Sequence, residues 1–293
     1  MLAEGPLERS TGLAEPTEAA VRQLSRRSIW FVLWLFRRLG RPLVDTVVAT
    51  DGGKVVGTGT IIWLRKTAYV AGIATKPEVR GRGIASRILA LLGEQARRRN
   101  RAWLALDVEG ENETAQRVYR KAGYREIARY TWFTRNDLPP TGAPVPPGVR
   151  PVKRADWEVL APELDRSRPP EYRSAFPARA RVISHNEFLV RSGHARVRTW
   201  FRRANNGAAC FVRVYFVLST RMAIYFPMST LPEPPSEEFA GLFEAATQWL
   251  RARSPSRSIA VAAQPRGAIA ESLERQGFTG VVSSAVMIRE SAP

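Results

Sequence analysis

A short loop of glycine and arginine, residues 80–85, has the composition of a phosphate-binding turn. It stands where an apolar strand pattern gives way to a helical one. Glycine adopts backbone conformations closed to other residues, so successive N–H groups can converge on phosphate oxygens, and the following helix points its positive end there. A tight turn with solvated arginines is the alternative interpretation. The loop consists of Arg80, Gly81, Arg82, Gly83, Ile84 and Ala85.

Polar residues after the next strand form a second group. Glu109 ends that strand, and Asn112 and Tyr119 are seven residues apart on the helix that follows. Glu109 is either a proton acceptor or a surface acid, and Asn112 is either a ligand contact or the N-cap of the helix. Gly123 and Tyr124 then end the helix.

The two groups together resemble the signatures of the GNAT acetyltransferase superfamily. Its acyl-CoA loop reads Arg or Gln, two residues, Gly, one residue, then Gly or Ala, and Arg80, Gly83 and Ala85 fill these places. The downstream group is similar to the branch typified by ribosomal-protein alanine acetyltransferases. The resemblance covers residues 68–124. It implies acetyl-CoA as co-substrate, no metal, and an amine acceptor, which is a small molecule, a peptide or a protein N-terminus.

The resemblance also implies direct transfer in a ternary complex, without a covalent acyl-enzyme. In it, the backbone of Ile73, Ala74 and Thr75 holds the pantetheine arm and polarises the thioester carbonyl. Tyr119 is the candidate general acid, because a phenol with a pKa of about 10 can protonate a departing thiolate. A tyrosine packed under the helix is the alternative.

The sequence alone does not identify the general base. Many family members carry a glutamate on the strand before the loop, but residues 69–74 hold no carboxylate. Glu109 could act through a water molecule. Alternatively, the enzyme captures an amine that is already neutral, which requires a low-pKa nucleophile such as an α-amino group at about 8.

An alternation of strands and helices positions these residues and predicts an α/β domain. The first sixteen residues form a loose lead-in to a helical stretch at Thr17–Leu39. The expected order is then strands Val44–Thr50, Lys54–Leu64 and Ala68–Thr75, a helix to about Arg98, strand Trp103–Val108, helix Asn112–Ala122 and strand Ile127–Thr134.

The second half repeats the pattern of the first. Residues 138–148 contain five prolines and two glycines and form the linker. The turn at Asp51 matches the turn at Asn205, and Gly123 matches Gly277, both at an offset of 154 residues, which indicates a tandem repeat. We therefore expect two GNAT-like domains, residues 1–137 and 149–293, each a mixed, mostly antiparallel sheet flanked by helices. The expected elements of the second domain are strands Val197–Ala204, Ala208–Leu218, Met222–Met228 and Ile259–Ala263 and helices Glu237–Arg253 and Gly267–Gln276.

The second domain departs from the signatures at two places. Its counterpart of the phosphate loop, Leu231–Pro235, lacks glycine, contains three prolines without N–H donors and adds a negative charge. Its counterpart of Tyr119 is Leu273. We expect a catalytically silent half that completes the substrate groove or fixes the arrangement of the pair. The same offset places the first domain's opening strand before Met1, so we expect that strand to be absent or irregular.

The net charge of +18, with 45 basic and 27 acidic residues in 293, favours anionic partners. A nucleic-acid role is one alternative, motivated by the basic runs Arg97–Arg101 and Arg196–Arg203. The second run contains Trp200 and Phe201. Only five of the basic residues are lysines, so a compositional preference for arginine is the other explanation.

The single cysteine, Cys210, cannot form an internal disulfide, which fits a reducing cytoplasm. The most apolar run, Ile29–Phe36, is far shorter than the roughly 18 residues that span a bilayer. A non-catalytic acyl-CoA sensor that works through partner contacts is the main alternative to an enzyme.

Overall fold

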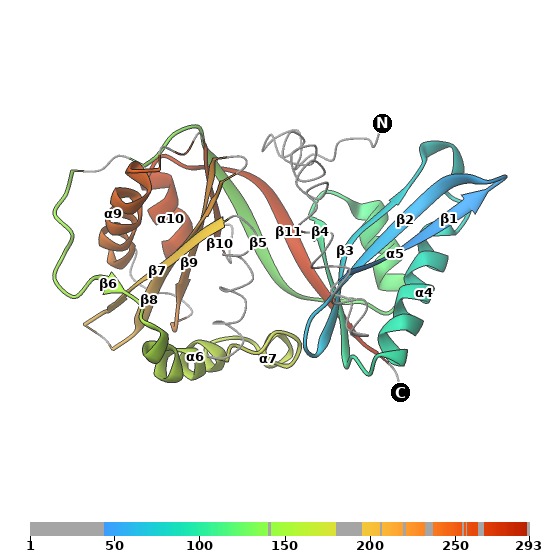
Figure 1. The fold of residues 1–293 in the computed structure, drawn as a ribbon, viewed down its shortest axis with the longest axis horizontal. Coiled ribbons are helices and arrows are strands. Elements are labelled where there is room, and N and C mark those ends of the chain that lie inside the picture. Colours follow the sequence, from blue (N-terminus) through green and yellow to red (C-terminus); the bar gives the residue numbers. More distant parts are fainter. Residues whose placement is uncertain are drawn as a thin grey trace.

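The computed structural model describes residues 44–139, 142–179, 195–205, 207–218, 221–231, 237–253, 255, 257–262 and 267–291 (Figure 1). The predicted helix Thr17–Leu39, the apolar run Ile29–Phe36 and the expected defect in the opening strand lie outside these residues. In the described part, no helix has the length and apolar character that crossing a bilayer requires.

Eleven strands form one hydrogen-bonded sheet in the order β1-β2-β3-β4-β11-β5-β10-β9-β8-β7-β6. The strands are β1 Val44–Asp51, β2 Lys54–Trp63, β3 Thr67–Thr75, β4 Trp103–Glu109, β5 Arg125–Arg135, β6 Arg150–Pro151, β7 Ala195–Arg203, β8 Ala209–Val217, β9 Met222–Ser229, β10 Arg257–Ala262 and β11 Thr279–Glu290. The helices are α4 Ile84–Arg98, α5 Glu113–Lys121, α6 Trp157–Arg166, α7 Pro170–Ala175, α9 Glu238–Arg251 and α10 Ala268–Arg275, with short 3-10 turns η1 Pro77–Val79 and η2 Arg154–Asp156.

Each half of the sheet has its own apolar core. Helices α4 and α5 cover one face of the first half, and α9 and α10 cover the corresponding part of the second half (Figure 1). Helix α6 packs on the opposite face of the second half, where Trp157 stacks on Phe211 with 6.0 Å between ring centroids. Helix α7 reaches the first half, because Ala175 packs against Ala105 and Ile288. The segment after the linker therefore contacts both halves.

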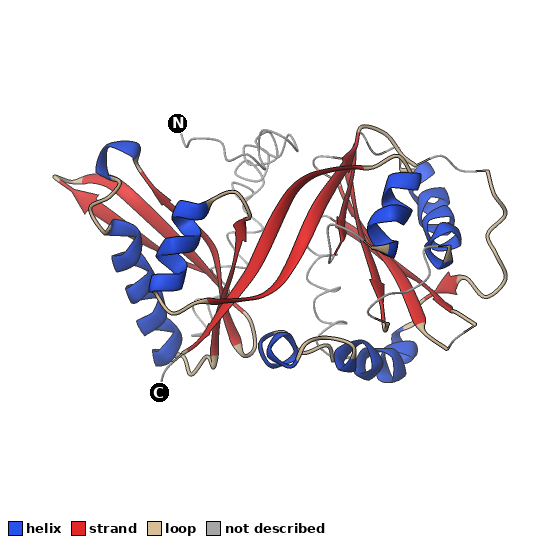
Figure 2. Ribbon diagram, turned by 180° about the vertical axis from the view of Figure 1, so that it is seen from behind, coloured by secondary structure: helices blue, strands red, loops and turns tan. Residues whose placement is uncertain are grey.

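The two halves exchange their long strands. β11, the last strand of the chain, lies between β4 and β5 in the first half, and β5 lies between β10 and β11 in the second. Figure 2 shows these two strands running side by side from one half to the other. Neither half closes its sheet with its own residues alone, so we expect the halves to fold as one cooperative unit.

Two arginines on the exchanged strands contact helix ends in the half they enter. Arg135 on β5 donates to the carbonyl of Gln276 after α10 at 2.5 Å, and Arg289 on β11 donates to the carbonyl of Ala122 after α5 at 3.0 Å. A cation at a helix C-terminus satisfies an unpaired carbonyl and complements the helix dipole. The two arginines are 154 residues apart, and so are Ala122 and Gln276, whose carbonyls they contact. The two contacts are therefore equivalent positions of the internal repeat.

The repeat expected from sequence is confirmed. Gly123 and Gly277 both have positive φ, at 85° and 78°, and both follow a helix whose end is closed by the same bond. In the first half the N–H of Tyr124 donates to Tyr119, and in the second half the N–H of Phe278 donates to Leu273, each at 3.0 Å. The domain limits 1–137, 138–148 and 149–293 stay predictions, because the strand exchange places part of each half in the sheet of the other.

Candidate active site

The strands β3 and β4 separate part of the way along their length. They pair in parallel from Thr67 with Trp103 to Val70 with Leu106 and no further. At the same level β3 bulges, because Val70 and Gly72 oppose consecutive residues of β2 and Ala71 has no partner there. Beyond the bulge, β3 pairs with β2 alone, so its other edge presents unpaired N–H and C=O groups to the opening.

The backbone groups predicted to hold the pantetheine arm lie on that edge. Ile73, Ala74 and Thr75 form the last part of β3 and are half-buried. Their partners in β2 are Gly59, Thr58 and Gly57. An extended chain can add to such an edge as another strand would, through main-chain hydrogen bonds.

The glycine loop after β3 leaves the start of α4 open. Gly81 and Gly83 have φ of 79° and 75°, and Gly81, Arg82 and Gly83 are exposed. Gly83 is the N-cap residue of α4, and no side chain accepts a hydrogen bond at this cap. The first N–H groups of the helix therefore point toward solvent without a capping partner, the arrangement that binds phosphate oxygens.

Two glycines in β2 let α4 pack directly on the sheet beside the loop. A Cβ atom at Gly59 would lie 2.3 Å from Cγ2 of Ile88, and one at Gly57 would lie 2.9 Å from Cγ2 of Ile84. The helix N-terminus is thereby held next to the free edge of β3. Arg82 and Arg87 line a neighbouring cavity of about 450 Å³ between α4 and β1. These cations and the open helix end fit a pyrophosphate group.

The second group of candidate residues lies around α5: Glu109 and Asn112 precede this helix, and Tyr119 lies on it. Asn112 caps this helix, since its Oδ1 accepts from the N–H of Ala115 at 3.0 Å. The structure thus shows the capping role, while a contact of Asn112 with the coenzyme stays a prediction. Tyr119 is half-buried against the first-half core, with its ring centroid 6.0 Å from that of Tyr124. Burial raises the pKa of Tyr119, so its hydroxyl remains protonated at neutral pH.

The strand β4 presents two carboxylates on the face away from α4. Leu106 and Val108 point into the core under α4, whereas the alternate residues Asp107 and Glu109 lie on the opposite face. Asp107 directly follows Leu106, the last residue of β4 that pairs with β3. It therefore stands at the base of the opening between the strands. Sequence reasoning selected Glu109 and did not select Asp107.

Two phenols hold the carboxylate of Asp107. The hydroxyl groups of Tyr69 on β3 and Tyr130 on β5 both donate to its Oδ2, at 2.6 and 2.9 Å. The surrounding protein raises the pKa of Asp107 by desolvation, and the two hydrogen bonds act in the opposite direction. Burial, followed by the charge of Asp107, raises the pKa of Tyr69 and Tyr130 well above the usual tyrosine value. Both phenols are therefore donors throughout the neutral range.

Helix α7 of the second half packs on the face of the sheet that carries Asp107. Tyr172 on α7 is close enough to Asp107 to feel its charge, although burial is the main cause of its raised pKa. Its ring lies 5.2 Å from that of Phe176, and Phe176 and Tyr69 pack against the same apolar cluster. The hydroxyl of Thr67 donates to the carbonyl of Ala175 at 2.5 Å and fixes α7 on the sheet.

A polar residue in the middle of an apolar strand was the available signal for Asp107. The run 103–108 reads Trp-Leu-Ala-Leu-Asp-Val, and Asp is depleted in strands. The two tyrosines that bind it come from other strands, 38 residues before it and 23 residues after it in the chain. Their convergence follows from the strand order, which the local sequence does not specify.

The loop, the open helix end and the divided strands are features of a known class of fold. Residues 14–124 match the model of the Acetyltransferase (GNAT) family. A tandem GNAT protein from the clavulanic acid biosynthesis pathway superposes with a TM-score of 0.59 at 19% identity, over 85% of this chain and 83% of that one. A GCN5-related N-acetyltransferase from Sphaerobacter thermophilus superposes with a TM-score of 0.59 at 16% identity, over 99% of this chain and 94% of that one. A search of curated proteins found no match.

The fold and the family match together identify the kind of domain that carries the site. The first half of this chain is a GNAT domain, and the chain as a whole has the tandem GNAT fold.

Proposed function

We propose that the first half transfers an acetyl group from acetyl-CoA to an amine by direct attack. The observation that carries the proposal is the position of one carboxylate. Asp107 stands at the base of the opening between β3 and β4, on the face opposite the glycine loop and α4. A coenzyme bound at the loop and an amine bound at Asp107 would meet through this opening.

In this proposal, the residues selected from the sequence bind the coenzyme. Arg80, Arg82 and the N–H groups from Gly81 to Ala85 would bind the pyrophosphate, and the free edge of β3 from Ile73 to Thr75 would bind the pantetheine arm. Acetyl-CoA supplies an activated thioester when bound. The exposed, positive-φ glycines and the uncapped helix support this assignment.

On the acceptor side, the carboxylate of Asp107 attracts the substrate as an ammonium ion and then takes its proton. Its raised pKa makes this carboxylate a better proton acceptor than an aspartate with the ordinary pKa. The phenols of Tyr69 and Tyr130 keep it oriented. Glu109 lies two residues further along the same face and stays the second candidate.

The reaction balances with these two groups. Asp107 takes the first proton of the ammonium ion and releases it to solvent, which leaves a neutral amine and a free carboxylate. The amine nitrogen then bonds to the thioester carbon, a second N–H proton passes to Asp107, and the carbon–sulfur bond breaks. The departing thiolate then takes the proton of the Tyr119 hydroxyl. Tyr119 packs on the α4 face and Asp107 lies on the other, so the acid and the base act from opposite sides of the sheet.

The second half has a supporting role in this proposal. Leu273, the counterpart of Tyr119, is fully buried in the second core and has no proton to donate. Most of the counterpart of the phosphate loop, from Pro232 onward, lies outside the described residues. α7 packs on the face of the sheet that carries Asp107, and β11 pairs with β4. These contacts support a groove that the second half completes. A cytoplasmic location stays part of the proposal.

Turnover distinguishes an enzyme from a sensor. Acetyl-CoA binding is measured by calorimetry, and CoA release is followed with a thiol reagent against small amines, peptides with free N-termini and ribosomal proteins. Cys210 does not disturb the assay, because burial raises the pKa of its thiol to about 11 and leaves it protonated and inaccessible. Tight binding without CoA release from any acceptor would support the sensor and contradict the enzyme.

A further inference from the structure

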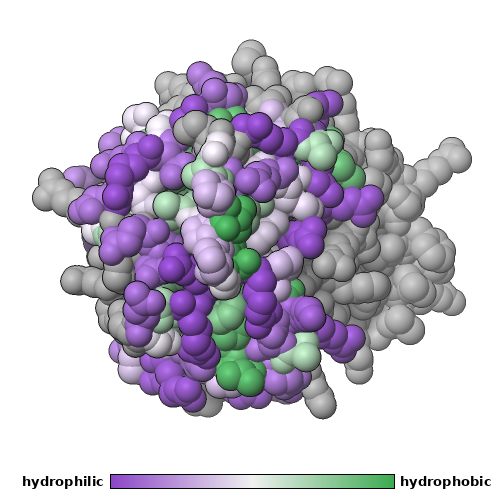
Figure 3. Space-filling view, turned by 90° about the vertical axis from the view of Figure 1, so that its left-hand side faces the viewer, coloured by the Kyte–Doolittle hydropathy of each residue, from purple (hydrophilic) through white to green (hydrophobic). Residues whose placement is uncertain are grey.

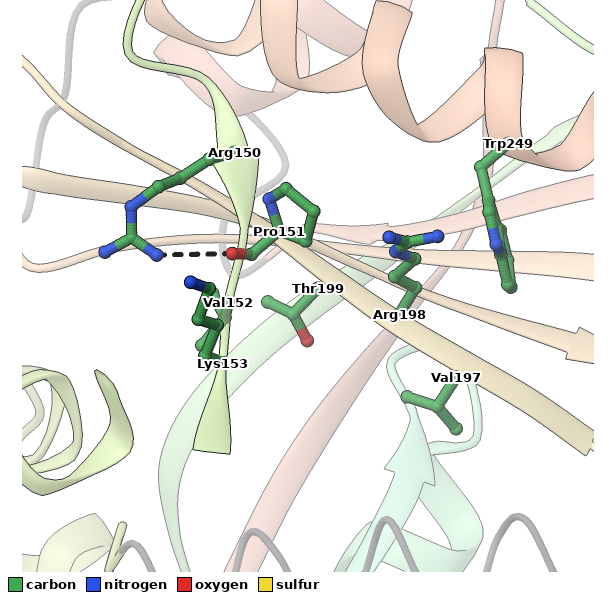
Figure 4. A pocket seen from close by; sticks show the side chains of 8 residues that line it. All are labelled: Arg150, Pro151, Val152, Lys153, Val197, Arg198, Thr199 and Trp249. Carbon is green, nitrogen blue, oxygen red and sulfur yellow. Dashed lines mark hydrogen bonds between the residues drawn. The ribbon is translucent and has the colours of Figure 1, made fainter. Parts of the chain in front are cut away.

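A second cavity lies far from the candidate active site, at the edge of the second half. Its volume is about 740 Å³. It is bounded by β6 with the residues after it, by the edge of β7, and by Trp249 on α9 (Figure 4). In Figure 1, β6 and α4 lie at opposite ends of the molecule. The groove is therefore separate from the coenzyme loop.

Basic side chains surround this groove. Arg150 and Lys153 lie at one end, and Arg198 lies beside Trp249 at the other (Figure 4). Arg253 belongs to the same cluster, because burial and then the charges of Arg198 and Arg196 lower its pKa. Like charges held this close favour an anion between them.

Most of these cations lack an acidic partner. Arg150 forms an ion pair with Asp156 at 2.7 Å. The charge of Lys153 also lowers the pKa of Asp156, although the two side chains form no ion pair. Among the described residues, no carboxylate lies within ion-pair distance of Arg198 or Arg253. The same holds for Arg196.

The strand β7 itself provides an internal comparison. At its far end Arg202 pairs with Glu238 at 3.3 Å, and Arg203 pairs with Glu163 at 2.9 Å. At the groove end, Arg196 and Arg198 have no such partners in the described structure. A general preference for arginine does not explain why acidic partners are placed at one end of a strand and not at the other.

Two tryptophans hold the arginines in place. The guanidinium of Arg253 lies 4.0 Å from the ring centroid of Trp249, and that of Arg198 lies 5.6 Å from the ring centroid of Trp200. The two indoles contact each other edge to face at 5.6 Å. Stacked guanidinium groups lose less conformational freedom when they bind phosphate.

The cations extend further than one phosphate group. Arg196 and Arg198 share the face of β7 that carries Trp200 and lie about 7 Å apart at ~3.3 Å per residue. Arg150 lies opposite Phe201, on the other face of the same edge. Figure 3 faces this side of the molecule and shows hydrophilic side chains flanking a narrow strip of paler and apolar residues. The length and form of the site suit a chain of phosphates.

We propose that this groove binds single-stranded nucleic acid through its phosphate backbone. Lys153, Arg196 and Arg198 contact successive phosphates, and the half-buried Trp249 offers an aromatic contact to a base at the groove wall. The site reads charge and strand flexibility, so it binds without strong sequence preference.

The test uses the full chain and a fluorescein-labelled oligouridylate of about 12 nucleotides, with anisotropy measured at several salt concentrations. Arg198→Gln is compared with Arg203→Gln, which removes one charge from the same strand outside the groove. We expect Arg198→Gln to weaken binding at least about fivefold and to reduce the slope of log K against log salt by about 0.7, the contribution of one phosphate on a single strand. Arg203→Gln should bind within about twofold of the wild type.

Two outcomes overturn the proposal. One is equal binding by Arg198→Gln and the wild type, or equal loss in both variants. The other is equally tight binding of a poly-glutamate peptide of the same charge, which would assign the groove to an acidic polypeptide. Lys153→Gln provides a second groove variant. Thermal unfolding and acetyl-CoA binding of each variant establish that the fold is intact, because the groove and the coenzyme loop are separate.

Discussion

Replacing Asp107 with asparagine removes the negative charge and keeps a side chain of the same shape between Tyr69 and Tyr130. The variant can still accept a hydrogen bond from a phenol, but it cannot accept a proton from the amine. A positioned general base contributes about 10²- to 10⁴-fold to the rate, so we expect kcat/KM to fall by that factor. Acetyl-CoA affinity should not change, because the glycine loop lies on the other face of the sheet.

The two phenols predict a second, finer effect on pH dependence. Their hydrogen bonds lower the pKa of Asp107 against the effect of burial. Asp107 works only when deprotonated. Tyr69→Phe removes one of these hydrogen bonds and should therefore raise the pKa of Asp107 and move the acidic limb of the kcat/KM profile to higher pH.

The assay is CoA release measured by chromatography between about pH 5 and 9, with Glu109→Gln as the matched control. We expect this control to retain most of its activity. The reasoning is refuted if Glu109→Gln loses activity while Asp107→Asn keeps it, since Glu109 would then be the base. A downward shift of the acidic limb in Tyr69→Phe would refute the role assigned to the phenols.

Three further changes probe the acid, the helix and the exchanged strands. Tyr119→Phe should lower kcat with little change in KM for acetyl-CoA; an unchanged rate, when chemistry is rate-limiting, removes the acid role. Gly59→Ala places a Cβ 2.3 Å from Ile88, so it should cost about 1–3 kcal/mol of stability and weaken coenzyme binding; calorimetric binding equal to wild type would contradict this. Arg289→Met should lower stability by about 2 kcal/mol and preserve a single unfolding transition; two separate transitions would show that the halves fold independently.

Local sequence determined the coenzyme side of the protein. The loop at residues 80–85, the helix that begins at Ile84 and the cap at Asn112 are all set by neighbours in the chain, because glycine conformations, helix starts and caps depend on residues within a few positions. The tandem repeat was visible for the same reason, since Gly123 and Gly277 end equivalent helices in equivalent ways.

Tertiary structure decided the acceptor side. Asp107 becomes a candidate base because the pairing of β3 with β4 stops at Val70 and because phenols from two other strands converge on it. The exchange of β5 and β11 also depends on strand order, which joins residues up to 187 positions apart, as in the pairing of Glu290 with Trp103. Periodicity in the sequence shows which face of a strand is buried, but it does not show which strand lies beside it.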